Sequence, residues 1–300
     1  MRPELQLILA SAKLQTSPPA PLHLTLNPSP SGEGLEEREQ EELQTINAHI
    51  PDVKDWEAFT QLVINNTTAP LLYNKLKQCK NAQLIPAASL ALLRKAYYTT
   101  FSRSTLMYAE FGQVVQLFQE NNIRFIALKG IYLCDWLYGD LGLRQMSDID
   151  LLVEEHDAEK CMELLRTRGY EQHPNKGLSE FVDNVERAQL TDIIHYDSFH
   201  LRDISIEIHI KLTSNKEPFT IDIPSLFRAA VPAEVNGMHI HALHPYDLLI
   251  HLTTHTDKHF KVGHVQLTSF SDLVNLLFKI ERTKNKEQRT KTRRRAKSKE

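Results

Sequence analysis

The chain has 300 residues, of which 41% are hydrophobic and 24% are charged, and its formal net charge is −3. This composition is typical of a globular protein and excludes a collagen-like chain, a coiled coil and a scaffold held by disulfides. No run of eighteen apolar residues occurs, which excludes a membrane-spanning helix. The three cysteines, Cys79, Cys134 and Cys161, are far apart and odd in number, which argues against a disulfide framework or a thiolate zinc site. We therefore expect a cytoplasmic protein.

The two ends of the chain are predicted to be disordered. Residues 1–38 hold six of the fourteen prolines and cannot bury enough surface to offset the entropy lost on ordering. Residues 282–300 hold ten Lys and Arg against two Glu, whereas residues 1–281 hold 25 basic and 36 acidic side chains. An acidic body of this kind excludes a protein that coats DNA. We expect the basic tail to be a solvated extension, with contact to RNA or an acidic partner as the alternative.

Residues 39–122 are predicted to form a helical subdomain. Asp55 can cap a helix whose apolar residues recur at helical spacing. Pro70 opens the next helix, and Pro86 precedes a longer one that ends near Asn121. No residue pattern in this part indicates chemistry.

Residues 123–243 are predicted to be a core of alternating strands and helices. Short strands are expected at 124–128 and 147–153, each followed by a helix. A hairpin is expected from Ile193–Phe199 and Ser205–Leu212, because both alternate apolar and polar residues. The predicted fold class is therefore α/β (α+β), a small mixed sheet with helices.

The segments beside this core are assigned from the same patterns. Residues 174–190 are expected to form a polar loop or a short helix. After Pro245, residues 246–258 and 265–281 return to helical spacing. Residues 244–281 are thus predicted to form a C-terminal helical subdomain, so the sheet is flanked by helical subdomains at both ends.

Asp148 and Asp150 are at the centre of the functional argument. Residues two apart on a strand point to the same face, so both carboxylates project to one place beside the buried Ile149. Aspartate is a poor strand former, and two acids so close repel each other unless a cation lies between them. This pattern favours a site for Mg²⁺, with Mn²⁺ as the alternative ion. The competing interpretation is a strand end whose acids face water.

Other residues near these acids point to phosphate binding. Glu207 completes a cluster of three carboxylates if its strand neighbours the first, and otherwise lies on the solvated face of an edge strand. Lys129 and Gly130 stand at a strand-to-helix turn, where glycine lets the backbone approach phosphate and the helix N-terminus adds positive charge. Arg144 and Ser147 precede the acids and can reach a triphosphate. Together these residues predict a phosphate-and-metal site.

The segment at residues 124–170 resembles the core of the nucleotidyltransferase superfamily related to DNA polymerase beta. More closely, it is similar to the bacterial group described as uncharacterised nucleotidyltransferases. The shared features are an L-K-G turn, an Arg, the string S-D-I-D-L-L-V, a helix that ends in G-Y, and a later E-I-H strand. The similarity covers roughly residues 50–280.

The resemblance implies a metal-dependent transferase. Asp148 and Asp150 would ligate two catalytic Mg²⁺ ions, and Glu207 would bind the second ion and activate the acceptor hydroxyl. The reaction would move a nucleoside monophosphate from an NTP to that hydroxyl and release pyrophosphate. The sequence does not specify the acceptor. Because the body is acidic, we expect a small molecule, a sugar or a protein rather than long nucleic acid, and no membrane partner.

The nucleotide is expected to contact a second group of residues, which comprises Lys129, Gly130, Arg144, Ser147 and His209. The superfamily usually has Gly or Ser after the glycine of this turn, whereas Ile131 follows it here. This departure favours an alternative function, a catalytically degenerate adaptor that binds a nucleotide or a partner. Retention of all three carboxylates favours the enzyme.

His251, His255 and His259 recur every four residues and form one stripe on a predicted helix. Three ligands from successive turns of one helix rarely converge on one zinc ion. We expect this histidine stripe to pack against the sheet or to line the acceptor cleft.

Overall fold

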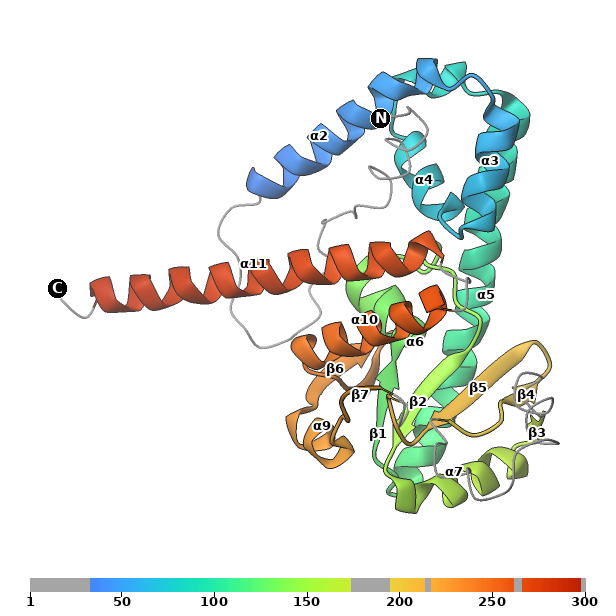
Figure 1. The fold of residues 1–300 in the computed structure, drawn as a ribbon, viewed down its shortest axis with the longest axis vertical. Coiled ribbons are helices and arrows are strands. Elements are labelled where there is room, and N and C mark those ends of the chain that lie inside the picture. The colour runs from blue at the N-terminus through green and yellow to red at the C-terminus, as the bar shows by residue number, and fades with distance from the viewer. Residues whose placement is uncertain (1–32, 174–194, 214–216, 262–265, 298–300) are drawn as a thin grey trace.

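The computed structural model describes residues 33–173, 195–213, 217–261 and 266–297. Most of the predicted N-terminal segment, residues 1–32, and the polar stretch at 174–190 lie outside these ranges. The described chain combines a mixed sheet, helices packed around it, and a helical part that precedes it in sequence (Figure 1). This arrangement confirms the predicted fold class.

The sheet has seven strands in the order β3-β4-β5-β2-β1-β7-β6. Their bounds are β1 Phe125–Leu128, β2 Ile149–Val153, β3 Glu171–Gln172, β4 Phe199–Leu201, β5 Ile204–His209, β6 Val231–Val235 and β7 Met238–Ala242. β2 is antiparallel to β1 and parallel to β5, and β1 is parallel to β7. β1 and β2 are buried along their whole length, as expected of central strands covered on both faces.

Two hairpins complete the sheet. The predicted one pairs β4 with β5 and turns at Arg202 and Asp203. The other pairs β6 with β7 and was not predicted. It turns at Asn236 and Gly237, whose φ angles of 48° and 78° are those of a type I′ turn. An Asn-Gly pair between alternating apolar residues is a known signal of such a hairpin, so the information was present in the sequence.

Within the described residues, four helices and two short 3₁₀ turns form the N-terminal part. Their bounds are α2 Glu33–His49, η1 Ile50–Asp52, α3 Trp56–Asn65, α4 Ala69–Leu76, η2 Lys80–Leu84 and α5 Ala87–Glu120. The Asp55 carboxylate accepts a hydrogen bond of 2.9 Å from the backbone N–H of Ala58, which confirms the predicted cap. α5 is 34 residues long and connects this part to the sheet (Figure 1), where Phe111 and Phe118 pack edge-on against Phe125 of β1.

The remaining helices follow the strands. Their bounds are α6 Lys129–Leu133, the π-helical η3 Cys134–Tyr138, α7 Glu155–Thr167, α9 Ile223–Ala229, α10 Pro245–Lys261 and α11 Leu267–Lys297. α10 and α11 pack together, and the C-terminal half of α11 extends beyond the body (Figure 1). Across the described ranges, no helix combines the length and the apolarity that crossing a bilayer requires.

The structure differs from the sequence expectations at both ends of the chain. α2 begins at Glu33, inside the segment predicted to be disordered up to residue 38. α11 continues to Lys297, through most of the basic tail expected to be disordered from residue 282. The expectation followed from low apolar content. Glu, Lys, Arg and Gln are nevertheless good helix formers, and neither segment contains proline within its helix.

A buried ion pair attaches α11 to the sheet domain. The Asp272 carboxylate accepts bonds from Arg144 Nε at 3.0 Å and Nη2 at 2.8 Å, and from the Tyr138 hydroxyl at 2.6 Å. Asp272 is 2% exposed. Because this two-point geometry satisfies both oxygens, the buried charges of Asp272 and Arg144 compensate each other.

Replacement of Asp272 by alanine should be strongly destabilising. Asp272→Ala leaves the Arg144 guanidinium buried without its counter-charge, and we expect a loss of about 3–5 kcal/mol in the free energy of unfolding. Urea denaturation measures this loss. As a control, Asp257→Ala removes the exposed pair with Lys261 on α10 and should leave the value nearly unchanged. Similar losses in both variants would contradict the proposed role of the buried pair.

Candidate active site

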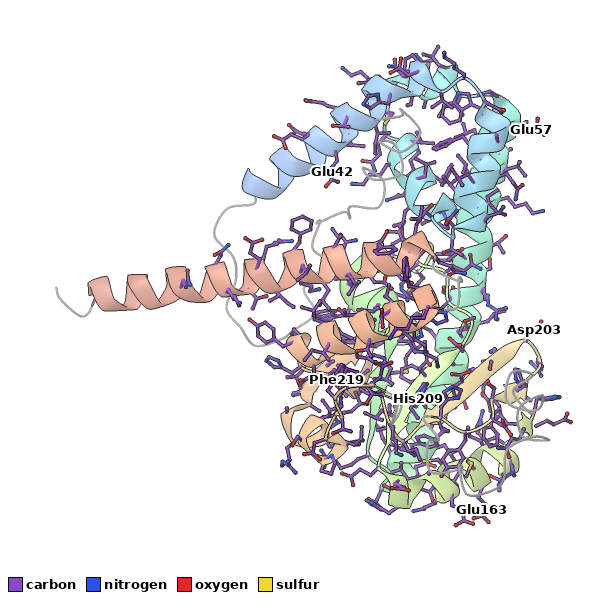
Figure 2. All side chains as sticks on the ribbon, in the orientation of Figure 1. Glu42, Glu57, Glu163, Asp203, His209 and Phe219 are labelled. Atoms are coloured by element: carbon purple, nitrogen blue, oxygen red, sulfur yellow. The ribbon has the colours of Figure 1, made fainter. Side chains whose placement is uncertain are left out.

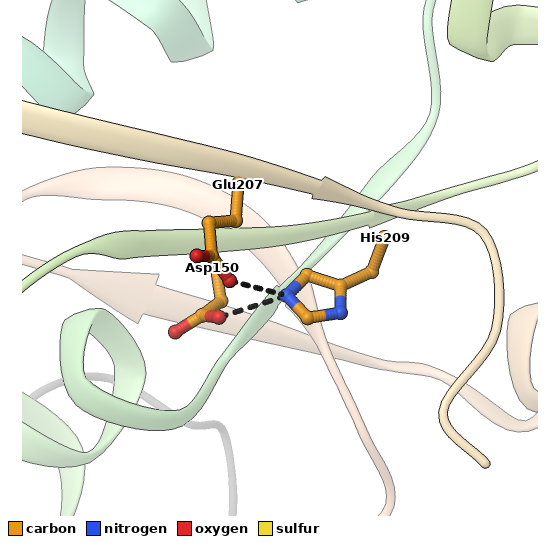
Figure 3. A group of neighbouring side chains, drawn as sticks. All are labelled: Asp150, Glu207 and His209. Carbon is orange, nitrogen blue, oxygen red and sulfur yellow. Dashed lines mark hydrogen bonds and ion pairs between the residues drawn. The ribbon is translucent and has the colours of Figure 1, made fainter. Parts of the chain in front are cut away.

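Two of the three acids identified in the sequence, Asp150 and Glu207, lie on neighbouring strands where β1, β2 and β5 are side by side. The register pairs Asp150 of β2 with Leu128 of β1 on one side and with Glu207 of β5 on the other. β5 therefore neighbours β2, which was the condition for a carboxylate cluster. His209 lies two residues after Glu207, and Figure 3 shows its ring directed at both carboxylates. Parallel pairing in register thus brings together residues that are more than fifty positions apart in sequence.

Asp150 is the most deeply buried acid of the group, with 1% of its surface exposed. Its Oδ1 lies 2.5 Å from Lys129 Nζ and 2.8 Å from His209 Nε2. Burial alone would raise the pKa of Asp150, but these two partners hold it well below its usual range. Burial would likewise lower the pKa of Lys129, whereas Asp150 and Asp148 raise it. The result is a fully ionised pair in the protein interior.

Glu207 has its own set of partners. Its carboxylate accepts a hydrogen bond of 3.1 Å from the Ser198 hydroxyl, and Oε2 lies 3.6 Å from His209 Nε2 and 3.9 Å from His195 Nδ1. Burial opposes ionisation, but the bond from His209 brings the pKa of Glu207 below its ordinary value. The pKa of His209 is raised in return, because Asp150 and Glu207 outweigh its burial. Ser198 and His195 were not identified from the sequence, where they follow no recognisable spacing.

Asp148 lies at the edge of this cluster and is half-buried. Burial and the neighbouring Asp150 and Glu207 carboxylates raise the pKa of Asp148 to about 6, although Lys129 and a hydrogen bond from Ser147 act in the opposite direction. Ser147 itself is exposed beside the carboxylates.

The donor atoms suit a divalent cation. One oxygen each of Asp150 and Glu207 and a ring nitrogen of His209 lie within 4.8 Å of one another. With Asp148, three carboxylates face the ammonium of Lys129 and one imidazole, so the group is negative even when His209 is protonated. Carboxylate oxygens are the ligands of Mg²⁺, and mixed oxygen and imidazole sets also accept Mn²⁺. The described residues therefore fit the metal chemistry expected from the sequence.

The turn that holds Lys129 and Gly130 is tightly packed. Lys129 follows β1 and begins α6 with a φ of 44°, in the left-handed region that non-glycine residues rarely adopt. Gly130 is buried, and a Cβ placed on it would lie 2.8 Å from both Arg144 Nη1 and Met146 Cβ. The absence of a side chain at Gly130 thus admits Arg144, whose guanidinium is held by Asp272. Gly130 therefore packs against Arg144, and Arg144 is paired with Asp272 of α11. The phosphate contacts expected of Gly130 and Arg144 stay predictions.

Arg103 of α5 is a further residue that the sequence did not single out. Its guanidinium donates to the carbonyl oxygens of Met146 and Ser147 ahead of β2, at 3.3 and 3.1 Å. It also donates to the carbonyl of Asp203 in the β4–β5 turn at 3.3 Å. One side chain of α5 therefore fixes the segment that leads into Asp148.

The histidine stripe of α10 lies near the cluster. His251 is 3% exposed, and neither of its ring nitrogens has a hydrogen-bond partner among the described residues. Burial, and then the Lys129 ammonium, lower the pKa of His251 to about 3 and that of His255 to about 2. His255 and His259 approach to 3.2 Å between their Nε2 atoms. The prediction that the stripe faces the sheet domain is therefore met at His251.

A sequence profile of the family described as "Uncharacterised nucleotidyltransferase" matches residues 52–299. The chain belongs to this family. Its membership confirms the resemblance found in the sequence and the predicted enzyme class, a nucleotidyltransferase. Among curated proteins, none matches the chain in sequence.

Several solved nucleotidyltransferase structures are similar to this family member at low identity. The antibiotic-resistance factor ANT(2'')-Ia is 12% identical, covers 66% of this chain and 95% of its own, and gives a TM-score of 0.42. The lincosamide antibiotic adenylyltransferase LnuA is 14% identical, covers 56% and 94%, and gives 0.37. A nucleotidyltransferase of Thermotoga maritima, TM1012, is 13% identical, covers 52% and 88%, and gives 0.38.

A methyl group at Gly130 should destabilise the enzyme. Gly130→Ala places a Cβ against Arg144 and Met146, and overpacking of this kind costs about 1–3 kcal/mol. Gly112→Ala is a matched control, because its Cβ meets the flexible end of Met238 at 3.2 Å and alanine favours the interior of α5. Thermal unfolding compares the two variants. Equal or greater stability of Gly130→Ala would contradict close packing at this turn.

The buried His251 predicts a specific pH dependence of stability. Its pKa is near 3 in the folded protein and near 6.5 when exposed, so the unfolded chain takes up a proton that the folded chain excludes. The stability due to neutral His251 is therefore complete above about 6.5 and is lost as the pH falls towards 3. Urea denaturation at several pH values should show a smaller loss in His251→Leu than in the wild type. Parallel stability curves for the two proteins would contradict this prediction.

Proposed function

We propose that this nucleotidyltransferase moves a nucleoside monophosphate from an NTP to a hydroxyl group of an acceptor and releases pyrophosphate, in a metal-dependent reaction. The observation that carries this proposal is the pairing of Asp150 with Glu207 on neighbouring strands beside Lys129. Asp148 lies near enough for its pKa to be shifted by all three. Family membership supports the class of reaction. The arrangement supports a site that accepts cations and phosphate together.

Asp148, Asp150 and Glu207 would hold the metal, with His209 beside them. Two Mg²⁺ ions, or Mn²⁺ in their place, would supply the usual chemistry of such a site, which is to acidify the acceptor hydroxyl and to neutralise charge on pyrophosphate. Glu207 is ionised at neutral pH because its pKa is lowered, so it can also accept the hydroxyl proton. Ser198 and His209 fix the direction of that carboxylate.

Basic and polar groups around the acids would bind the donor nucleotide. Lys129 supplies an ammonium within reach of the carboxylates, and a phosphate oxygen is the natural partner for it once a cation has taken over Asp150. Asp272 holds two nitrogens of Arg144, while Nη1 lies next to Gly130. Arg144 Nη1, the Gly130 turn and the exposed Ser147 would then contact the phosphates. The ring of His209 would complete this set.

We propose a small molecule, a sugar or a protein as the acceptor. The support is electrostatic, because residues 1–281 carry 25 basic against 36 acidic side chains and would repel long nucleic acid. The basic end of α11 is the place where RNA or an acidic partner would bind. Buried, free Cys79, Cys134 and Cys161 accord with action in the cytoplasm.

A catalytically degenerate adaptor is the second candidate. The buried ion pair between Lys129 and Asp150 favours it, because the Lys129 ammonium satisfies the Asp150 carboxylate without a metal ion. The Ile131 side chain after Gly130 is fully buried, in a position where the superfamily usually has a smaller residue. On this view the protein would bind a nucleotide or a partner without turnover.

Binding of nucleotides distinguishes the two functions. We expect calorimetry with ATP, GTP, CTP and UTP to detect binding of at least one nucleotide in the presence of Mg²⁺, and chelation by EDTA to abolish it. Asp150→Asn should lose this binding, because the amide removes a charged metal ligand. Asp203→Asn is the matched control, since Asp203 lies at the β4–β5 turn away from His209 (Figure 2).

The same experiment contains the contradicting results. Nucleotide binding that Asp150→Asn retains, or that does not depend on Mg²⁺, would support the adaptor. Binding to none of the four nucleotides would overturn the proposed donor.

A further inference from the structure

The face of α10 near the site contains a buried imidazole that the proposed reaction does not use. His251 is almost completely buried, and both of its ring nitrogens lack a hydrogen-bond partner within the part of the chain that the structure describes. A buried polar group without a partner destabilises a protein, typically by more than one hydrogen bond contributes. Such a group therefore points to a partner that arrives in another state of the protein.

The surrounding charges indicate which partner this is. Among the charges that shift the pKa of His251, the Lys129 ammonium acts most strongly, ahead of His209 and Asp150. Lys129 is also the strongest charge acting on His255. His251 is also neutral under ordinary conditions, so one of its ring nitrogens carries a free lone pair. A neutral imidazole is a suitable acceptor for an ammonium group, whereas a protonated one would repel it.

The Lys129 ammonium in turn occupies a position at Asp150 that a bound metal ion would take from it. Its Nζ lies 2.5 Å from the same Asp150 oxygen that His209 contacts, and a cation ligated by Asp150 would compete with the ammonium for this carboxylate. His209 shares this oxygen with Lys129 through an imidazole whose charge is delocalised. A divalent cation carries two full charges on one ion and would repel the ammonium strongly in a buried site. Lys129 is 12% exposed and cannot simply extend its ammonium into water. A cation at Asp150 therefore requires a second position for the Lys129 ammonium.

We propose that His251 is a positioning residue that accepts a hydrogen bond from Lys129 when a divalent cation displaces Lys129 from Asp150. This inference rests on the proposed cation site. Lys129 has three donor hydrogens, so an ammonium held by His251 keeps others for a phosphate oxygen of the donor nucleotide. The unpaired imidazole thus provides the hydrogen-bond acceptor at the second position of the Lys129 ammonium. Movement of this one side chain then couples cation binding to phosphate binding.

A double-mutant cycle with Mn²⁺ alone as the probe tests this proposal. In the wild type, we expect calorimetry to detect Mn²⁺ binding that Asp150→Asn loses. His251→Leu should bind Mn²⁺ about tenfold more weakly or worse, because the displaced ammonium has lost its acceptor. His251→Gln keeps a neutral acceptor and should recover most of this affinity. His239→Leu makes the same change at an exposed position of β7 and should bind as the wild type does.

The second half of the cycle is made in Lys129→Met. Without the ammonium there is nothing for His251 to accept, so His251→Leu should leave the affinity of Lys129→Met for Mn²⁺ unchanged. A merely structural role of His251 would instead weaken binding equally in both backgrounds.

A spectroscopic measurement keeps the proposal testable if His251→Leu does not fold. The ¹⁵N resonance of a His251 ring nitrogen should shift when Mg²⁺ is added to the wild type, and should not shift in Lys129→Met. Equal Mn²⁺ affinity of wild type and His251→Leu, or a ¹⁵N shift that persists in Lys129→Met, would overturn the role of His251 while leaving the cation site intact. Absence of Asp150-dependent Mn²⁺ binding in the wild type would overturn the cation site and this inference together.

Discussion

A carboxylate buried in the middle of a sheet must be matched by positive charge, and most of the site follows from how Asp150 meets this requirement. The cost of removing a carboxylate from water is several kcal/mol unless ion pairs and hydrogen bonds replace the lost solvation. Lys129 directly follows the next strand on one side, and His209 belongs to the next strand on the other, so the compensation is built from the neighbours that the sheet topology supplies. Glu207 then shares His209, and burial together with both carboxylates raises the pKa of the neighbouring Asp148.

The same principle holds α11 in place on the other side of the turn. Asp272 and Arg144 are both buried and satisfy each other, and Gly130 provides the space into which the guanidinium fits. Two compensated ion pairs, one with Lys129 and one with Arg144, therefore border adjacent residues of a single strand-to-helix turn. The hydrogen bonding of the Arg144 pair is complete, since Tyr138 also donates to Asp272. The Lys129 pair has a further acceptor nearby, because His251 has unused hydrogen-bonding capacity.

The strand alternation in the sequence was enough to place Asp148 and Asp150 on one face, because residues two apart on a strand share a face. It could not decide whether the strand of Glu207 lies beside them, which depends on the pairing of β2 with β5. Lys129 and His209 were also assigned to the site from their positions at a turn and on the face of Glu207. The partner of Arg144 could not be predicted, since Asp272 is 128 positions away and nothing in the local pattern of α11 marks it. The same holds for Ser198, His195 and Arg103, whose roles depend on tertiary contacts. The hairpin at Asn236 was missed although its turn signal was present, and the helical ends of α2 and α11 were missed because low apolar content was given more weight than helix propensity.

The length of α5 has a consequence for how the molecule unfolds locally. Its first turns belong to a small hydrophobic cluster with α3 and α4, through residues such as Leu93, and its last turns belong to the large cluster of the sheet, through Phe111 and Phe118. Between them the buried positions are the polar Thr100 and Ser104, and the large side chains Phe101 and Leu106 are exposed. One unbroken helix of about 50 Å thus passes through two apolar environments of different size. In hydrogen exchange, its backbone amides would fall into two classes with different opening free energies, the slower one at the end that packs against the sheet.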